Sequence, residues 1–206
     1  MPEYLTLPRG ALAALGRKDP ALGRLIRRVG PFRLESSRGE GHLAALTRSI
    51  VYQQLSGKAA ATIYGRFRAL FPETRYPTPE EILDVDEATL RGCGLSRQKL
   101  AALRDLCVQV ESGALPLDQL DAEGDEQIIA QLTRVKGIGR WSAEMFLLFH
   151  LGRLDVWPVT DLGIRKAMME LRDEDELPAP RAMIEMGEPL RPYRSVASWY
   201  LWRSLD

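Results

Sequence analysis

Cysteine and histidine are scarce in this chain of 206 residues, which holds two of each. Cys93 and Cys107 lack the CxxC spacing of a zinc or redox motif, and two cysteines are too few for a four-cysteine iron–sulfur cluster. His42 and His150 argue against a histidine-rich metal site and exclude the zinc site of nucleobase deaminases. We expect each histidine at the surface or at a helix end, and we expect no disulfide.

Long apolar runs are also missing. No stretch of eighteen apolar residues occurs, and residues 1–5 lack the basic start and apolar run of a signal peptide. We therefore expect an intracellular protein without a membrane partner, cytoplasmic and nucleoid-associated in a bacterium or nuclear in a eukaryote.

Neither sign of charge is in excess, since Lys+Arg and Asp+Glu both number 28. Composition alone therefore does not indicate a nucleic-acid partner. A local basic face and an ordinary mixed-charge surface both remain open. The basic residues near expected turns or helix starts are Arg97, Lys99, Lys136, Arg140, Arg165 and Lys166.

Strand signals are few, and apolar residues recur with the period of a helix, so the sequence predicts an all-α protein. Ser56, Asp86 and Ser96 are expected to begin helices, and the run from Thr78 to Glu81 has the cap, first-turn proline and N3 glutamate of a capping box. Residues 31–34 fit a short extended piece. The acidic segment 173–180 fits a surface loop before a terminal helix.

The run from Leu132 to Ala143 predicts two helices that meet at a very short turn. We expect positive φ at both Gly137 and Gly139, and a second helix that begins at Arg140. Backbone N–H groups at such a turn and helix start suit a phosphate oxygen. A Gly-x-Gly turn also occurs for purely conformational reasons, and the Rossmann and P-loop patterns are absent.

Four blocks of the sequence together resemble the helix-hairpin-helix DNA glycosylase superfamily, HhH-GPD, and most closely its 3-methyladenine DNA glycosylase II branch. They span residues 43 to 200 in the order found in that family. The blocks are Ile50-Val-Tyr-Gln-Gln-Leu-Ser56, Gly94-Leu-Ser-Arg-Gln-Lys-Leu100, Val135-Lys-Gly-Ile-Gly-Arg-Trp-Ser-Ala143 with Asp161, and Arg191-Pro-Tyr-Arg-Ser195.

The resemblance implies an all-α fold of two helical lobes with the active site in the cleft between them. Residues 40–153 would form the central lobe with the hairpin, and residues 1–39 with 154–206 the second lobe. We expect no N-terminal β domain, which some relatives carry. The implied protein is a monomer that binds double-stranded DNA with damaged bases.

The resemblance also implies that the enzyme flips an alkylated base out of duplex DNA and hydrolyses its N-glycosidic bond in base excision repair. Asp161 matches the catalytic aspartate, which would stabilise positive charge on deoxyribose and orient the attacking water. Its structural alternative is a first-turn helix residue beside a cap at Thr160. No cofactor is expected for catalysis.

Trp141 occupies the position where bifunctional glycosylase/lyases carry a Schiff-base lysine, so we expect no lyase activity. Aromatic faces attract the positive charge of alkylated purines. Trp141 and Tyr193 match pocket positions of the family. Tyr52 is a further pocket candidate, with core packing as its alternative, and Met145 falls where some relatives have an aromatic residue.

The turn 53–55 matches the family's wedge loop, with Gln54 as the first candidate to fill the gap left by the flipped base and Leu55 as the second. The resemblance also implies a monovalent cation, Na or K, held by the carbonyls of Thr133, Val135 and Gly137. The residues expected to bind DNA phosphate are Lys136, Gly137, Gly139, Arg140 and Ser142.

Two alternatives remain open. One is a glycosylase for oxidised, mispaired or otherwise damaged bases, which the missing lysine and cluster cysteines disfavour. The other is a non-catalytic protein that binds damaged DNA and uses the hairpin only to grip phosphate. Asp161 separates these classes, because a binding protein needs no carboxylate at that place.

Overall fold

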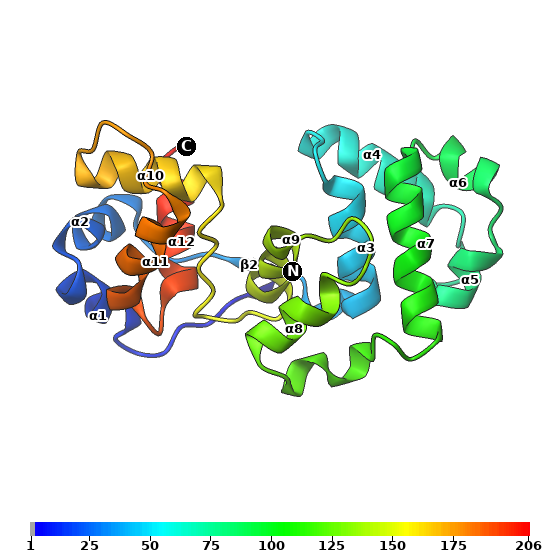
Figure 1. The fold of residues 1–206 in the computed structure, drawn as a ribbon, viewed down its shortest axis with the longest axis horizontal. Coiled ribbons are helices and arrows are strands. Elements are labelled where there is room, and N and C mark those ends of the chain that lie inside the picture. The colour runs from blue at the N-terminus through cyan, green and yellow to red at the C-terminus, as the bar shows by residue number, and fades with distance from the viewer. Residues whose placement is uncertain (1–2) are drawn as a thin grey trace. The chain divides into compact units, whose positions relative to one another are not determined.

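The computed structural model describes residues 3–206 and divides into two compact units. Unit 1 comprises the chain up to residue 36 together with 147–206, and unit 2 comprises residues 37–146, whereas the sequence placed the boundaries at 40 and 153. Helices dominate, which confirms the all-α class (Figure 1). Within the described residues the strands are β1, Glu3–Tyr4, and β2, Glu35–Ser36, which pair antiparallel.

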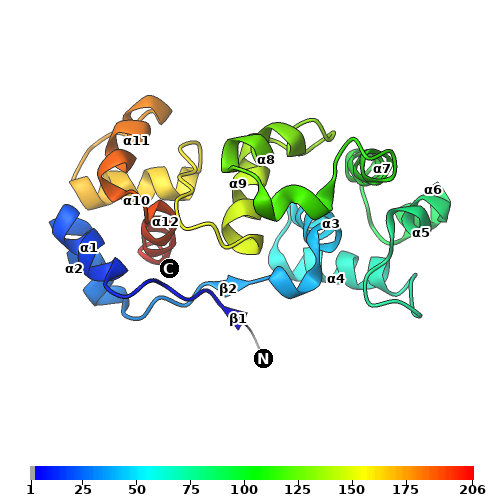
Figure 2. The same ribbon diagram turned by 90° about the horizontal axis from the view of Figure 1, so that it is seen from below.

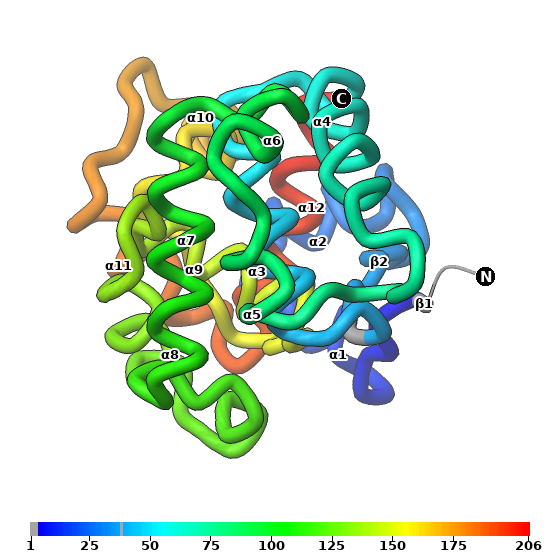
Figure 3. The backbone as a smooth tube through the Cα atoms, turned by 90° about the vertical axis from the view of Figure 1, so that its right-hand side faces the viewer, coloured from blue at the N-terminus to red at the C-terminus, as the bar shows by residue number. Residues whose placement is uncertain are grey.

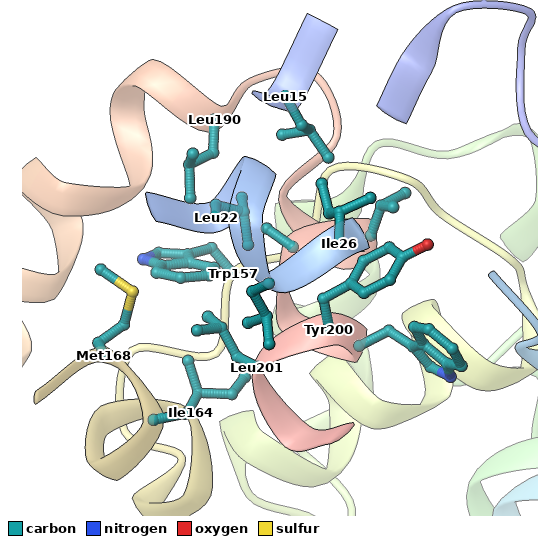
Figure 4. Packing of buried hydrophobic residues seen from close by; sticks show 14 of the residues in the cluster. Leu15, Leu22, Ile26, Trp157, Ile164, Met168, Leu190, Tyr200 and Leu201 are labelled. Atoms are coloured by element: carbon teal, nitrogen blue, oxygen red, sulfur yellow. The ribbon is translucent and has the colours of Figure 1, made fainter. Parts of the chain in front are cut away.

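Unit 1 packs its helices around α12, whose residues are buried along almost its whole length. Figure 2 shows α12 beside α2 and α10. Side chains from all five helices and from the connecting segments meet in the core of unit 1, including Leu22, Trp157, Ile164 and Tyr200 (Figure 4). The helices of unit 1 are α1 Ala11–Lys18, α2 Pro20–Val29, α10 Leu162–Arg172, α11 Pro180–Gly187 and α12 Arg194–Arg203.

The first two helices of unit 1 cross at a pair of glycines. A Cβ atom on Gly23 would lie 2.9 Å from the Cα of Gly16, so the close approach of α1 and α2 requires the missing side chain. The α2 helix begins with Pro20 after the cap Asp19, whose carboxylate accepts the N–H of Leu22 at 3.0 Å. This Asp-Pro start signal lies in a region where the sequence predicted no helix.

Unit 2 confirms the predicted helix starts. Ser56, Asp86 and Ser96 each accept a backbone N–H of the first turn, and Thr78 with Glu81 forms a complete capping box. The α7 helix packs beside α5 and α6 (Figure 3). The helices of unit 2 are α3 His42–Tyr52, α4 Gly57–Arg68, α5 Pro79–Asp84, α6 Glu87–Gly92, α7 Arg97–Glu111, α8 Asp125–Leu132 and α9 Arg140–Met145, which continues into a π-helical turn, Phe146–His150.

Three further local features are residues 31–34, the segment after the acidic loop, and the histidines. Residues 31–34 lie directly before β2 without belonging to a strand, and the carbonyl of Leu34 accepts the N–H of Leu5 at 2.9 Å. The α11 helix, begun by Pro180, follows the acidic loop and was not predicted. His42 begins α3 and His150 ends the π-helical turn, so both histidines lie at helix ends as expected, and His150 is buried there.

Both cysteines are free and buried, as the sequence led us to expect for a chain without a disulfide. Burial raises the pKa of Cys93 and raises that of Cys107 to about 12, so both are protonated thiols near neutral pH. Among residues 3–206, no helix is both long and apolar enough to cross a membrane.

Candidate active site

The hairpin between α8 and α9 reverses the chain at Gly137, which has a φ of 76°. Gly139 has a φ of −89° and serves as the extended N-cap of α9, so the prediction of positive φ at both glycines was wrong. One left-handed residue is enough, because the N–H of Ile138 already closes the turn on the carbonyl of Val135 at 3.1 Å. A Cβ on Gly137 would lie 3.1 Å from the Cβ of Ala102 on α7, so the hairpin lies close against that helix.

The cationic side chains of the hairpin differ in their partners. Lys136 is exposed, its backbone N–H donates to Asp105 at 2.8 Å, and its ammonium forms only a long ion pair with the same carboxylate, at 3.9 Å. The Arg140 guanidinium instead bonds the carboxylates of Glu126 and Glu144. The hydrogen bonds with Glu126 raise the pKa of Arg140 and lower that of Glu126. Lys136 is therefore more available than Arg140 to bind a phosphate. To bind a DNA phosphate as predicted, Arg140 must give up a hydrogen bond to one of its carboxylate partners.

The turn 53–55 is tied to the hairpin by Gln53. Its side-chain amide donates to the carbonyl of Gly137 at 3.0 Å and to the hydroxyl of Ser142 at 3.3 Å. The neighbouring Gln54 is exposed and holds a φ of 55°, which is unusual for a residue with a side chain, and Leu55 is 38% exposed. Both wedge candidates thus project from a turn anchored to the hairpin, and the anchoring residue is one that the sequence did not single out.

Lys99 supports the same turn from α7. Its ammonium donates to the carbonyl of Val51 at the end of α3, at 2.7 Å, and burial lowers the pKa of Lys99. The sequence grouped Lys99 with basic residues of a possible surface face. In the structure it satisfies a helix-end carbonyl instead.

The carbonyls proposed for a monovalent cation keep acceptor capacity. Val135 accepts the N–H of Ile138 and Gly137 accepts the amide of Gln53, and each carbonyl oxygen has a second lone pair. Together with Thr133, whose hydroxyl bonds back to the carbonyl of Ile129 on α8, these residues are compatible with a cation. Among the described residues, no group of three or more His, Cys, Asp or Glu side chains could hold a metal ion.

The pocket candidates in unit 2 are all accessible to some degree. Trp141 is 44% exposed in the first turn of α9, which is unusual for a tryptophan that serves only to fill a core. Tyr52 and Met145 are half-buried. The Tyr52 ring contacts Tyr64, with centroids 6.3 Å apart, and the guanidinium of Arg48 lies 5.2 Å from its centroid.

In unit 1, Asp161 is the N-cap of α10 and is 7% exposed. Its Oδ1 accepts the N–H of Ile164 at 2.8 Å, so the expected cap at Thr160 was wrong by one residue. The same oxygen accepts the indole N–H of Trp202 on α12 at 3.0 Å. These two donors orient a buried carboxylate, and Trp202 is a site residue that the sequence did not indicate.

The indole of Trp202 is itself held on two sides. It stacks on Phe149 with centroids 5.7 Å apart and an interplanar angle of 21°. A Cβ on Gly163 would lie 3.2 Å from both Trp202 and Asp161 Oδ1, so glycine leaves the space that this contact needs. Tyr193, the other candidate of unit 1, is half-buried against the core at the start of α12.

Residues 47–192 match the HhH-GPD superfamily of base excision DNA repair proteins. The chain belongs to the HhH-GPD superfamily. It is 37% identical over 204 residues to DNA-3-methyladenine glycosylase 1 of Schizosaccharomyces pombe, covering 98% of this chain and 90% of that protein. A putative DNA-3-methyladenine glycosylase of Bacillus subtilis, YfjP, is 34% identical over 78% of this chain and 58% of its own length.

Solved structures agree with this membership. The Schizosaccharomyces pombe 3-methyladenine DNA glycosylase in complex with abasic DNA has a TM-score of 0.85 and 36% identity, covering 94% of this chain and 95% of that one. A DNA-3-methyladenine glycosidase from Bacillus halodurans has a TM-score of 0.87 and 35% identity, covering 98% and 92%. The fold expected from the sequence motifs is thus confirmed as that of the HhH-GPD glycosylases.

Proposed function

We propose that this HhH-GPD protein is a DNA glycosylase that removes alkylated bases such as 3-methyladenine from duplex DNA in base excision repair. The observation that carries the proposal is the 37% identity with a DNA-3-methyladenine glycosylase over 98% of the chain. The match to a relative bound to abasic DNA, the product of base removal, supports DNA as the partner.

Asp161 is the proposed catalytic residue. Positive charge develops on deoxyribose as the glycosidic bond breaks, and a carboxylate stabilises that charge more strongly in a buried site than in water. The bonds from Ile164 and Trp202 orient the carboxylate before the reaction, so little reorganisation is needed at the transition state. The same group can orient the water that attacks the sugar.

An aromatic pocket suits the proposed substrate. An alkylated purine with a formal positive charge is attracted to the face of Trp141 or Tyr193 by roughly 0.5 to 2 kcal/mol. The base must first leave the helical stack, and Gln54, with Leu55 as the alternative, would fill the resulting gap. The bonds from Gln53 and Lys99 hold this turn in place and so support that role.

The proposed enzyme is monofunctional. A lyase step needs an amine that forms a Schiff base with the sugar, and Trp141 stands at the hairpin position where that amine would lie. The product is then an abasic site in an intact strand. The hairpin with Lys136 would bind a phosphate oxygen, and a Na or K ion on the carbonyls of Thr133, Val135 and Gly137 would add positive charge there.

Methylated duplex DNA tests the proposal directly. Purified protein is incubated with this DNA, released bases are separated by chromatography, and strand breaks are measured before and after alkali. Release of methylated purines with breaks only after alkali is the expected result. Direct nicking would contradict the monofunctional assignment, and binding without release would contradict the glycosylase assignment.

A further inference from the structure

The region of the first two helices of unit 1 carries an excess of positive charge, although the whole chain has no net charge. Residues 9–33 contain seven basic residues and one acidic residue, a local excess of six positive charges in a chain with no net charge. All seven basic side chains are exposed. The acidic residue, Asp19, is buried and paired with Arg172, so it does not offset them at the surface.

Three of these residues lie on one face of α2. Arg24, Arg27 and Arg28 have the i, i+3 and i+4 spacing that places side chains side by side on a helix. The opposite face, with Leu22 and Ile26, points into the core of unit 1 (Figure 4). We call Arg24, Arg27 and Arg28 the basic α2 face.

No carboxylate within the described residues forms an ion pair or a hydrogen bond with the basic α2 face. Like charges at these spacings destabilise a helix. The helix dipole favours Arg27 and Arg28 in the last turn but does not account for Arg24. Six other arginines of the described residues do have carboxylate partners, namely Arg48, Arg140, Arg172, Arg191, Arg194 and Arg203.

We infer that the basic α2 face is a second DNA-binding surface, which contacts the phosphate backbone without reading sequence or damage. The Cβ atoms of neighbouring arginines on a helix lie about 5–6 Å apart, so their long side chains can reach separate phosphates of a DNA backbone. Guanidinium groups bind phosphate through two parallel hydrogen bonds. The inference rests on the proposed function only in taking DNA as the partner, and it assigns a contact beyond the hairpin and Asp161.

The test is the affinity for an undamaged, fluorescently labelled 30-base-pair duplex as a function of salt. Each phosphate contact adds about 0.9 to the slope of log affinity against log salt. Replacing all three arginines, Arg24→Gln, Arg27→Gln and Arg28→Gln, should lower this slope by about two to three and weaken binding at least about tenfold at 0.1 M salt. Arg181→Gln, at an exposed site on α11 of the same unit, is the matched control for each single substitution and should have little effect.

Base release distinguishes this inference from the proposed function. At saturating enzyme the triple variant should release methylated bases from a short duplex at the wild-type rate, because the substituted residues lie outside the proposed active site. Circular dichroism and the single variants establish that folding is retained. The inference would be overturned if the triple variant kept the wild-type DNA affinity and salt slope. It would also be overturned if the loss of affinity per substituted arginine were no larger than that of Arg181→Gln. A triple variant that loses binding to polyglutamate but keeps its DNA binding would also overturn the inference, in favour of an acidic protein partner.

Discussion

The indole N–H of Trp202 on α12 donates to Oδ1 of Asp161, the cap of α10, at 3.0 Å, and so joins two residues that are 41 positions apart in the chain. The same oxygen accepts the N–H of Ile164, so both bonds restrain one carboxylate. The orientation of the proposed catalytic carboxylate therefore depends on α12 as well as on the cap of α10.

Asp161→Asn should lower base release by about 100-fold or more, because the charge that stabilises the transition state is lost. Asparagine caps helices as well as aspartate does, so the fold should be retained. Chromatography of released bases gives the rate, and thermal unfolding reports the fold. DNA binding should persist or tighten once the carboxylate no longer repels phosphate. An unchanged release rate would rule out Asp161 as the catalytic residue.

Trp202→Phe should slow single-turnover base release about tenfold or more while leaving DNA affinity unchanged. The reason is the loss of a charge-assisted hydrogen bond worth roughly 1.5–3 kcal/mol that orients Asp161. Trp199→Phe, the same substitution on the same helix, is the control, since Trp199 does not contact Asp161. Equal effects of the two substitutions would indicate that Trp202 acts only through packing. An independent check is the indole N–H resonance of Trp202, which should shift in Asp161→Asn.

Trp141→Ala should weaken catalysis on cationic lesions by roughly 2- to 30-fold, the range that corresponds to a cation–π contribution of 0.5–2 kcal/mol. Trp141→Phe should retain more of the activity. The release of a neutral lesion such as hypoxanthine should slow less in Trp141→Ala. Release rates on the cationic and the neutral substrate measure the difference. Borohydride should trap no covalent complex between the wild-type protein and DNA. A trapped complex would show that another amine performs a lyase step.

Arg172→Ala should lower the free energy of unfolding by roughly 1.5–3 kcal/mol, because it leaves the buried carboxylate of Asp19 without its charged partner. This pair links the start of α2 to the end of α10, whose other end carries Asp161. Urea unfolding measures the loss, and Arg181→Ala at an exposed site is the control. A change as small as that of the control would mean that the pair adds no net stability.

Arg140→Gln should change how stability depends on pH. The bonds from Arg140 hold the pKa of Glu126 below its ordinary value of 4.5, so their contribution is present above that value and is lost as the pH falls through the lowered pKa. The part of the wild-type advantage in melting temperature that comes from Glu126 should therefore be small, because Glu126 is largely exposed, and should shrink between pH 5 and pH 3. The bond from Arg140 to the buried carboxylate of Glu144 adds a contribution of its own. Melting curves of both proteins across this range provide the test, and an advantage that grows toward acid would refute it.

Local signals in the sequence correctly predicted much of this protein. The side-chain caps at Ser56, Thr78, Asp86 and Ser96 each bond a backbone N–H within one helical turn. A few neighbouring residues are therefore enough to predict them. The order of four motifs was sufficient to identify the superfamily, which the match over residues 47–192 confirms. The roles of Asp161, Trp141 and the wedge turn stay predictions that mutagenesis must test.

Tertiary structure decided what depends on residues far apart in the chain. The bond between Gln53 and Gly137 spans 84 residues, and that between Trp202 and Asp161 spans 41, so no periodicity or spacing could indicate either. The conformation of Gly139 and the burial of His150 likewise depend on how the turns around them pack. Sequence determined which residues match the motifs of the family, because side-chain identity is a local property. Folding determined which neighbours orient them, because hydrogen bonds and burial depend on three-dimensional proximity.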